Sequence, residues 1–178
     1  QLRLTMTLSL LQPAARVLEV GVGSGVLVPT LTKHFPHYTG TDLVLQPGLE
    51  RLVAPGCDAR FMQADLLDEG SLPEESFDAI VCVSVLEHIR ERGSAARSLA
   101  RALRRGGRLV AAYPMVNQPM SRAFEMIGFL NIDHHHHSSP RDIELALGRE
   151  LVKVDRVALP PGFPVGLALY QAAAWTKP

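Results

Sequence analysis

The 178-residue sequence has two cysteines, few aromatic residues and no net charge. Cys57 and Cys82 stand far apart and form no C-x-x-C pair, so we expect free thiols in a reducing compartment. Eighteen basic residues balance eighteen acidic ones, which argues against nucleic acid as a partner. No apolar run approaches the ~20 residues of a membrane span, and the apolar first eleven residues are shorter than a signal peptide. We therefore expect a cytoplasmic monomer or homodimer that binds neither membrane nor nucleic acid.

The sequence does contain apolar material and a regular alternation of strand and helix signals. Apolar residues make up 47% of the chain, which suffices for a single domain over 1–178. Strands are predicted at 16–20, 38–41, 59–63, 77–83 and 108–113. Helices are predicted at 25–33, 47–53, 94–105 and 140–149. This alternation indicates an α/β fold with a doubly wound parallel sheet and helices on both faces.

Both ends of the chain add elements to this pattern. Strands at 152–159 and 167–175 leave no room for a helix between them and predict an antiparallel hairpin at one sheet edge. Residues 2–10 alternate strictly between apolar and other residues, which is a strand pattern.

The predicted helix at 94–105 carries a row of arginines and should end at Gly106-Gly107. The arginines are Arg97, Arg101, Arg104 and Arg105. We interpret them as a solvated helix face in preference to a phosphate-binding surface.

A glycine-rich turn follows the first predicted strand. The run from Val17 to Gly25 reads VLEVGVGSG, with glycines at Gly21, Gly23 and Gly25. Glycines at alternate positions allow a sharp turn and let a ligand approach the backbone. The spacing differs from the G-x-G-x-x-G of dinucleotide folds and lacks the Gly-Lys-Ser/Thr of a P-loop.

Polar residues also follow the next three predicted strands. Asp42 and Asp65 end the second and third strands, and Ser84 to His88 follow the fourth. Ligands of parallel sheets bind beyond the carboxyl ends of the strands, so these residues should converge on one crevice. A carboxylate there can accept two hydrogen bonds from the hydroxyls of a ribose. Either aspartate could instead cap a turn, where this residue is common.

Taken together, the chain resembles the class I S-adenosylmethionine-dependent methyltransferases, in their small-molecule "methyltransferase type 11"-like branch. The matching segments, in the family's order and spacing, are VLEVGVGSG (17–25), GTD (40–42), QADLLD (63–68), FDAIVCVSVLEHI (77–89) and LRRGGRLVAAYP (103–114). The resemblance implies a Rossmann-like seven-stranded sheet whose last strand is antiparallel. It also implies a helix before the first strand, in conflict with the alternation in 2–10.

The resemblance further implies which residues bind the cofactor, S-adenosyl-L-methionine, and its product S-adenosyl-L-homocysteine. These residues are Glu19, Gly21, Gly23, Asp42, Leu43, Asp65, Leu66 and Ser84. The acid and glycines after the first strand would hold the methionine end, together with the backbone of Ser84. Asp42 would bind the ribose hydroxyls, and Asp65 with Leu66 would contact the adenine.

Candidates for the acceptor side are fewer. His88 is the candidate general base, because its ordinary pKa lies near neutrality, although a structural histidine at a helix start fits as well. Tyr113 either contacts the acceptor or covers the end of the sheet. Residues 115–138 are rich in apolar side chains and predict a lid over the acceptor, with packing against the sheet as the alternative.

The histidine tract 134–137 lies within this segment. In an extended chain alternate side chains share a side, so His135 and His137 could line the acceptor site together. A solvent-exposed loop fits equally, a general base less well, and we predict no metal site.

The function that follows is transfer of a methyl group to an O, N, C or S atom of a small molecule. No Asn/Asp-Pro-Pro-aromatic motif follows the fourth strand, which argues against nucleic-acid acceptors. The alternative is a catalytically silent cofactor-binding module or partner subunit of the same fold. A nicotinamide dehydrogenase is disfavoured by the glycine spacing.

Overall fold

The structure is a computed structural model that describes residues 2–115, 139–160 and 168–178. Its strands are β1 (Arg16–Val20), β2 (His37–Asp42), β3 (Asp58–Gln63), β4 (Phe77–Val83), β5 (Leu103–Pro114), β6 (Val152–Leu159) and β7 (Tyr170–Thr176). Its helices are α1 (Leu2–Ser9), α2 (Val28–His34), α3 (Arg92–Ala102) and α5 (Pro140–Leu147), with 3-10 turns η1 (Leu49–Leu52) and η2 (Leu86–His88).

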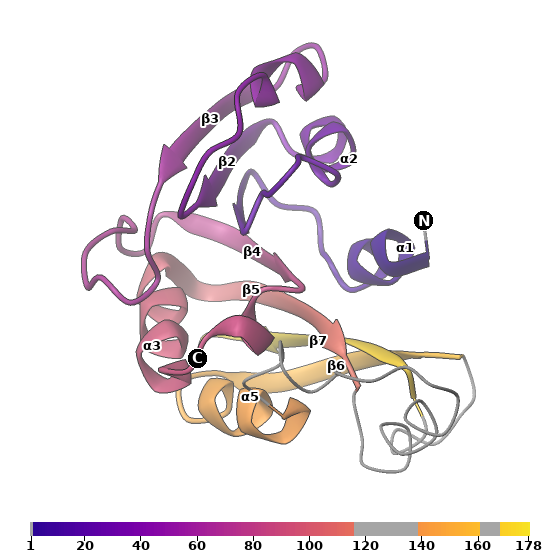
Figure 1. Ribbon diagram of the computed structural model, residues 1–178, viewed down its shortest axis with the longest axis vertical. Coiled ribbons are helices and arrows are strands. Elements are labelled where there is room, and N and C mark those ends of the chain that lie inside the picture. The colour runs from indigo at the N-terminus through magenta and orange to yellow at the C-terminus, as the bar shows by residue number, and fades with distance from the viewer. Residues whose placement is uncertain (1, 116–138, 161–167) are drawn as a thin grey trace, which may run out of the picture.

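The strands form one seven-stranded sheet in the order β3-β2-β1-β4-β5-β7-β6 (Figure 1). The pairs β3–β2, β2–β1, β1–β4 and β4–β5 are parallel. Strand β7 runs antiparallel to both β5 and β6. The predicted mostly parallel sheet with an antiparallel C-terminal hairpin is therefore confirmed. The strand order reverses between β1 and β4, which is where such sheets bind ligands.

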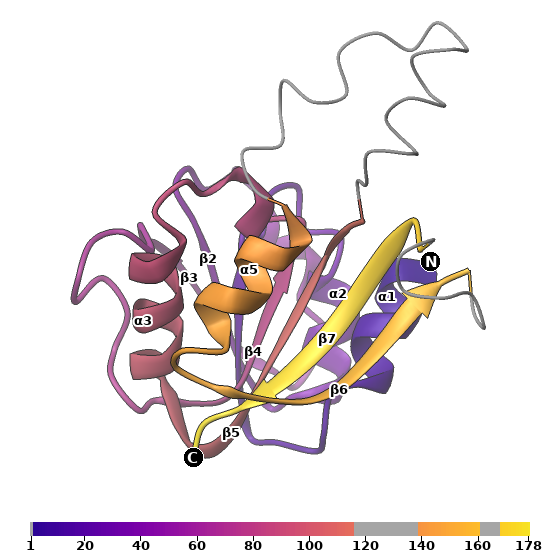
Figure 2. The ribbon, with the colours of Figure 1, turned by 90° about the horizontal axis from the view of Figure 1, so that it is seen from below.

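Helices cover both faces of the sheet, as the alternation of elements predicted. Helices α3 and α5 lie on one face, and α1 and α2 lie on the other (Figure 2). Successive strand residues point to opposite faces, so Leu18 and Ile80 enter the core under α3 and α5. Val17 and Val81 enter the core under α2. Strands covered on both faces have continuous apolar sequences, which is why the apolar run at 77–83 predicts β4 at its observed bounds.

The N-terminal segment is a helix, as the resemblance implied and against the strand pattern of its leucines. In the helix, Leu4 and Leu8 lie four residues apart and pack with the α2 core. Met6 and Leu10, which lies in the turn just after the helix, have the same spacing and pack against β5 and β7. Because the segment buries two apolar rows against different parts of the core, its sequence alternates like that of a strand although it forms a helix.

Helix α3 ends earlier than predicted, so Arg97 and Arg101 lie on it as an exposed face, whereas Arg104 and Arg105 do not belong to the helix. The helix stops at Ala102, and Leu103 already pairs with Phe77 of β4. Arg104 therefore belongs to β5 and forms an ion pair with Asp78 at 2.9 Å. The Gly106-Gly107 pair lies inside β5, in an irregular stretch of the ladder, and does not end a helix.

Helix α2 begins three residues later than predicted, at Val28. Gly25 has a φ of +81°, and its N–H donates to the carbonyl of Val22 at 2.9 Å. Residues 22–25 therefore form a turn, and helical geometry starts only after it.

Cys57 and Cys82 are free thiols, as predicted, and Cys82 is buried. None of the helices in the described ranges has the length and apolar character needed to cross a membrane. The predicted lid lies outside the described residues beyond Met115.

Helix α5 begins with a capping box. The N–H of Asp142 donates to Ser139 Oγ, and the N–H of Ser139 donates to Asp142 Oδ2, each at 3.3 Å. The exchange satisfies N–H groups that the first helical turn would otherwise leave without a partner.

We expect Ser139→Ala to lower the free energy of unfolding by about 1 kcal/mol, because it removes this cap. Urea denaturation measures the effect. Leu145→Ala, at a side chain that is 56% exposed on the same helix, is the matched control and should change stability by less than about 0.5 kcal/mol. Equal losses in the two variants would mean that the cap does not stabilise the helix.

Candidate functional site

The carboxyl ends of β1, β2, β3 and β4 meet around a cavity of about 610 Å³. The predicted site residues that line it are Gly21, Gly23, Asp42, Leu43, Asp65, Leu66, Ser84 and His88. They come from four separate stretches of sequence and are brought together at the reversal of strand order. A cavity of this size is within the usual range for a cofactor or small ligand.

The glycine-rich turn is held against the end of β2. The N–H groups of Gly21 and Val22 both donate to the carbonyl of Thr41, at 2.8 and 3.0 Å. Gly21 has a φ of +78°, and a Cβ on it would lie 2.3 Å from Val85 Cγ2. Backbone conformation and available space therefore both require glycine at this position.

Asp42 connects the end of β2 to the same turn. Its Oδ2 accepts a hydrogen bond of 2.8 Å from the N–H of Gly23. The side chain is only half-buried, and the exposed Leu43 lies next to it at the cavity. A carboxylate offers about four lone-pair positions, so Asp42 can hold Gly23 and still accept hydrogen bonds from a ligand.

Asp65 forms a local turn at the cavity wall. Its Oδ1 accepts a hydrogen bond of 2.9 Å from the N–H of Leu67. The neighbouring Leu66 is buried, and its carbonyl accepts a hydrogen bond of 2.7 Å from Ser98 Oγ of α3. Asp65 thus caps a turn, as one interpretation held, and it also lines the cavity, as the other required.

Ser84 follows β4 in a left-handed conformation, with a φ of +56°. Residues with a Cβ rarely adopt this conformation. The N–H of Ser84 donates to the carbonyl of Ala112 at 2.8 Å, and its hydroxyl lies 3.0 Å from the hydroxyl of Tyr170.

His88 ends the short turn η2 and is exposed at the cavity. Its N–H donates to the carbonyl of Val85 at 3.0 Å, which fixes the backbone of the turn. The preceding Glu87 is buried, so the two neighbours point into different environments. His88 is therefore placed where a general base for a bound acceptor could act.

Glu19 is not among the residues that line the cavity. It is 1% exposed, and its Oε2 accepts a hydrogen bond of 2.6 Å from the hydroxyl of Tyr38. Burial raises the pKa of Glu19 to about 7; the Tyr38 hydrogen bond acts in the opposite direction, and the charge of Asp42 adds to the rise. Its predicted contact with the methionine end stays a prediction.

Tyr113 also lies away from the cavity lining. It is 1% exposed, its hydroxyl donates to Glu144 at 3.3 Å, and Gln171 Nε2 donates to it at 3.1 Å. Burial, with the nearby charge of Glu144, raises the pKa of the Tyr113 hydroxyl. Its position fits the sheet-covering interpretation better than acceptor contact. His135 and His137 lie outside the described residues.

The cavity wall includes a segment that the sequence analysis missed. Ile89, Arg90 and Glu91 line the cavity next to His88, and Val85 lines it beside Gly21. Ile89 is the last residue of the LEHI stretch, and Arg90 and Glu91 follow it directly, although no motif assigned any of the three a role.

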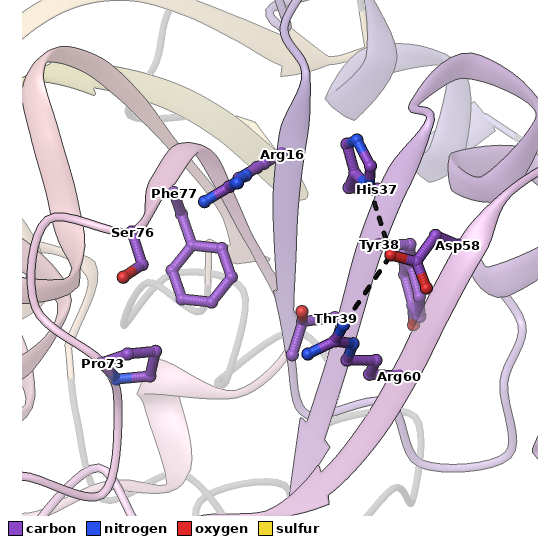
Figure 3. Close-up of a pocket in the computed structure, with 9 residues that line it drawn as sticks. All are labelled: Arg16, His37, Tyr38, Thr39, Asp58, Arg60, Pro73, Ser76 and Phe77. Carbon is purple, nitrogen blue, oxygen red and sulfur yellow. Dashed lines mark hydrogen bonds and ion pairs between the residues drawn. The ribbon is translucent and has the colours of Figure 1, made fainter.

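A second cavity, of about 270 Å³, lies at the amino-terminal edge of the strands (Figure 3). Asp58 Oδ2 pairs with His37 Nδ1 at 3.3 Å and with a guanidinium nitrogen of Arg60 at 3.9 Å. Exposed ion pairs of this kind contribute little stability. Among the residues that line this cavity none was predicted for the cofactor site, and we assign it no role.

Comparison with known proteins gives a family match and several relatives. A family model described as "Methyltransferase domain" matches residues 18–111. The ubiquinone biosynthesis O-methyltransferase of Aeromonas salmonicida (strain A449) is 31% identical over 97 residues, which are 53% of this chain and 41% of that protein. The protein of the same name from Hahella chejuensis (strain KCTC 2396) is 28% identical over 120 residues, 65% of this chain and 50% of that protein. The chain spans about half the length of these curated relatives.

Solved structures share the whole fold. An S-adenosylmethionine-dependent methyltransferase from Mesorhizobium loti superposes with a TM-score of 0.73 at 16% identity, covering 96% of this chain and 95% of that one. The N-methyltransferase NodS from Bradyrhizobium japonicum WM9, in complex with S-adenosyl-L-homocysteine, gives a TM-score of 0.68 at 21% identity, covering 99% and 83%. The fold is therefore that of S-adenosylmethionine-dependent methyltransferases.

The raised pKa of Glu19 makes stability depend on pH. At pH values between 4.5, the ordinary pKa of a glutamate, and about 7, Glu19 holds a proton in the folded state that it releases in the unfolded state. The resulting stabilisation is fully present below pH 4.5 and is lost as the pH rises through 7. The shift corresponds to roughly 3 kcal/mol.

We therefore expect the free energy of unfolding of the wild type to fall by roughly 2–3 kcal/mol more than that of Glu19→Gln between pH 5 and pH 8. Urea denaturation at both pH values gives this difference. Glu50→Gln, at an exposed carboxylate, should follow the wild type. If the free energies of unfolding of the wild type and Glu19→Gln changed equally with pH, the raised pKa of Glu19 would be contradicted.

Proposed function

The chain belongs to the methyltransferase-domain family, whose class I members use S-adenosylmethionine, and we propose that it transfers the methyl group of this cofactor to a small-molecule acceptor. The observation that supports this most is the convergence of eight predicted residues on the cavity at the β1–β4 reversal. The name of one relative, a ubiquinone biosynthesis O-methyltransferase, also favours a small acceptor.

The groups at the cavity fit the chemistry of the cofactor. Asp42, at the end of β2, would accept hydrogen bonds from the ribose hydroxyls while it holds Gly23. The apolar Leu43 and Leu66 would contact the two faces of the adenine, and Asp65 would accept a hydrogen bond from its amino group. Ser84 would contribute its backbone on the methionine side.

When bound, the cofactor supplies a methyl group on a sulfonium, and in-line displacement moves the methyl to the acceptor and leaves a neutral thioether. The residues of the chain would hold both partners in line and exclude water, which contributes up to ~7–11 kcal/mol in favourable cases. A hydroxyl acceptor must lose a proton, and His88 at the cavity would take it.

The alternative is a module that binds the cofactor and does not turn over. A methyl-labelled cofactor incubated with phenols, amines and thiols distinguishes the two, with transfer RNA and protein as control acceptors. A labelled small product supports the proposal. Binding with no transfer to any acceptor supports the silent module, and a labelled macromolecule contradicts the small-molecule assignment.

We expect Asp42→Ala to weaken S-adenosyl-L-homocysteine binding at least tenfold, because it removes the charged acceptor for the ribose hydroxyls. Isothermal titration calorimetry measures the dissociation constant, and thermal unfolding checks the fold. Asp58→Ala is the matched control, because Asp58 lies at the amino-terminal end of β3, away from the cofactor cavity, and this variant should bind like the wild type. Unchanged affinity of Asp42→Ala would contradict the ribose assignment.

We expect His88→Ala to lower kcat on a hydroxyl acceptor by 10²–10⁴-fold and to leave the affinity for S-adenosyl-L-homocysteine within about twofold. Steady-state kinetics and calorimetry separate the two quantities. The loss of kcat should become smaller as the pH rises, because the hydroxyl acceptor then ionises without a general base. Turnover equal to that of the wild type would make His88 a structural residue.

A further inference from the structure

Ser84 occupies the point where β4 opens into the cofactor cavity. Its φ of +56° is in the left-handed region, which a residue with a Cβ adopts only when its surroundings hold it there. The contacts that hold Ser84 therefore determine the shape of this part of the cavity wall.

Two hydrogen bonds anchor Ser84, and they come from different strands. Its N–H donates to the carbonyl of Ala112 on β5, at 2.8 Å. Its hydroxyl shares a hydrogen bond of 3.0 Å with the hydroxyl of Tyr170 on β7. Ser84 is half-buried and Tyr170 is buried, so water competes little for this second bond.

The route of Tyr170 across the sheet depends on small residues. Strand β5 lies between β4 and β7, so the tyrosine must cross it to reach Ser84. Tyr170 belongs to the same buried cluster as Ala112 of β5 and Ala172 of β7, which also pair with each other. Alanines at these positions leave room for the aromatic side chain over β5.

The two anchors together fix the third branch at the Ser84 Cα. With its nitrogen and its side chain both held, φ at Ser84 is set, and with it the direction of the bond from the Cα to the carbonyl carbon. No hydrogen bond to this carbonyl is made by the residues in the described ranges. Because Ser84 lines the cavity, this carbonyl is available there as an acceptor for an ammonium group.

We propose that Tyr170 is a positioning residue for the cofactor site, acting through Ser84 to hold the carbonyl that accepts the ammonium group of the methionine moiety. This inference rests on the proposed function, because it needs S-adenosylmethionine or its product in the cavity. It assigns to β7, outside the matched family segment of 18–111, a part in the cofactor site.

The experiment compares the dissociation constant of S-adenosyl-L-homocysteine in two backgrounds. In the wild type, Tyr170→Phe should weaken binding about five- to tenfold, and Ser84→Ala should do the same, because each removes the same hydrogen bond. In a Ser84→Gly background, glycine adopts the left-handed conformation without an anchor, so adding Tyr170→Phe should change the dissociation constant less than twofold.

Thr176→Val is the matched control on β7. Its hydroxyl donates to the carbonyl of Gly107 at 3.1 Å, at the far end of the same strand, and its loss should leave binding within twofold. Thermal unfolding of each variant separates loss of binding from loss of the fold.

The outcomes separate the inference from the proposed function. Wild-type binding with an unaffected Tyr170→Phe would overturn the inference alone. If Tyr170→Phe weakens binding as much in the Ser84→Gly background as in the wild type, the inference is also overturned, because the loss of affinity would then come from general packing and not from the bond to Ser84. No binding by the wild type would overturn the proposed function and the inference with it.

Discussion

The attachment of the glycine turn to the end of β2 is the constraint on which the rest of the site depends. Thr41 accepts two backbone hydrogen bonds from the start of the turn, and Asp42 accepts one from Gly23. These bonds hold the ends of β1 and β2 together across the site. Val85 closes the turn from the β4 side and leaves no space for a side chain at Gly21. The cavity at the strand-order reversal exists because these three strand ends are held in contact.

Electrostatics distinguishes the two acidic residues beside this turn. Glu19 is buried with the hydroxyl of Tyr38, and burial raises its pKa to about 7. Asp42 is half-buried, faces the cavity and keeps lone pairs for a ligand. The negative charge of Asp42 further disfavours ionisation of Glu19. A ligand that donates hydrogen bonds to Asp42 would weaken that repulsion, so the buried and exposed acids are coupled.

Most of the fold could be predicted from the sequence, because the local sequence signals of most strands and helices agree with the tertiary structure. The apolar run of β4 needed no long-range information, and the strand ends at Asp42 and Asp65 located the cavity. The end of α3 could not be predicted, because Leu103 leaves the helix to pair with Phe77, 26 positions earlier in the chain. Likewise, the burial of Glu19 depends on Tyr38, and the hold on Ser84 depends on Tyr170, 86 positions later. No motif records such pairings between distant residues.

If the proposed function is right, the cavity at the β1–β4 reversal is shaped for an adenosyl group carrying a methionine chain. A crystal structure of the protein with S-adenosyl-L-homocysteine would show this. We expect the ribose hydroxyls on the carboxylate of Asp42, the adenine beside Asp65 and Leu66, and the amino acid end near the carbonyl of Ser84. Ligand density at the amino-terminal edge of the strands, or an adenosyl group that leaves Asp42 without contact, would contradict it.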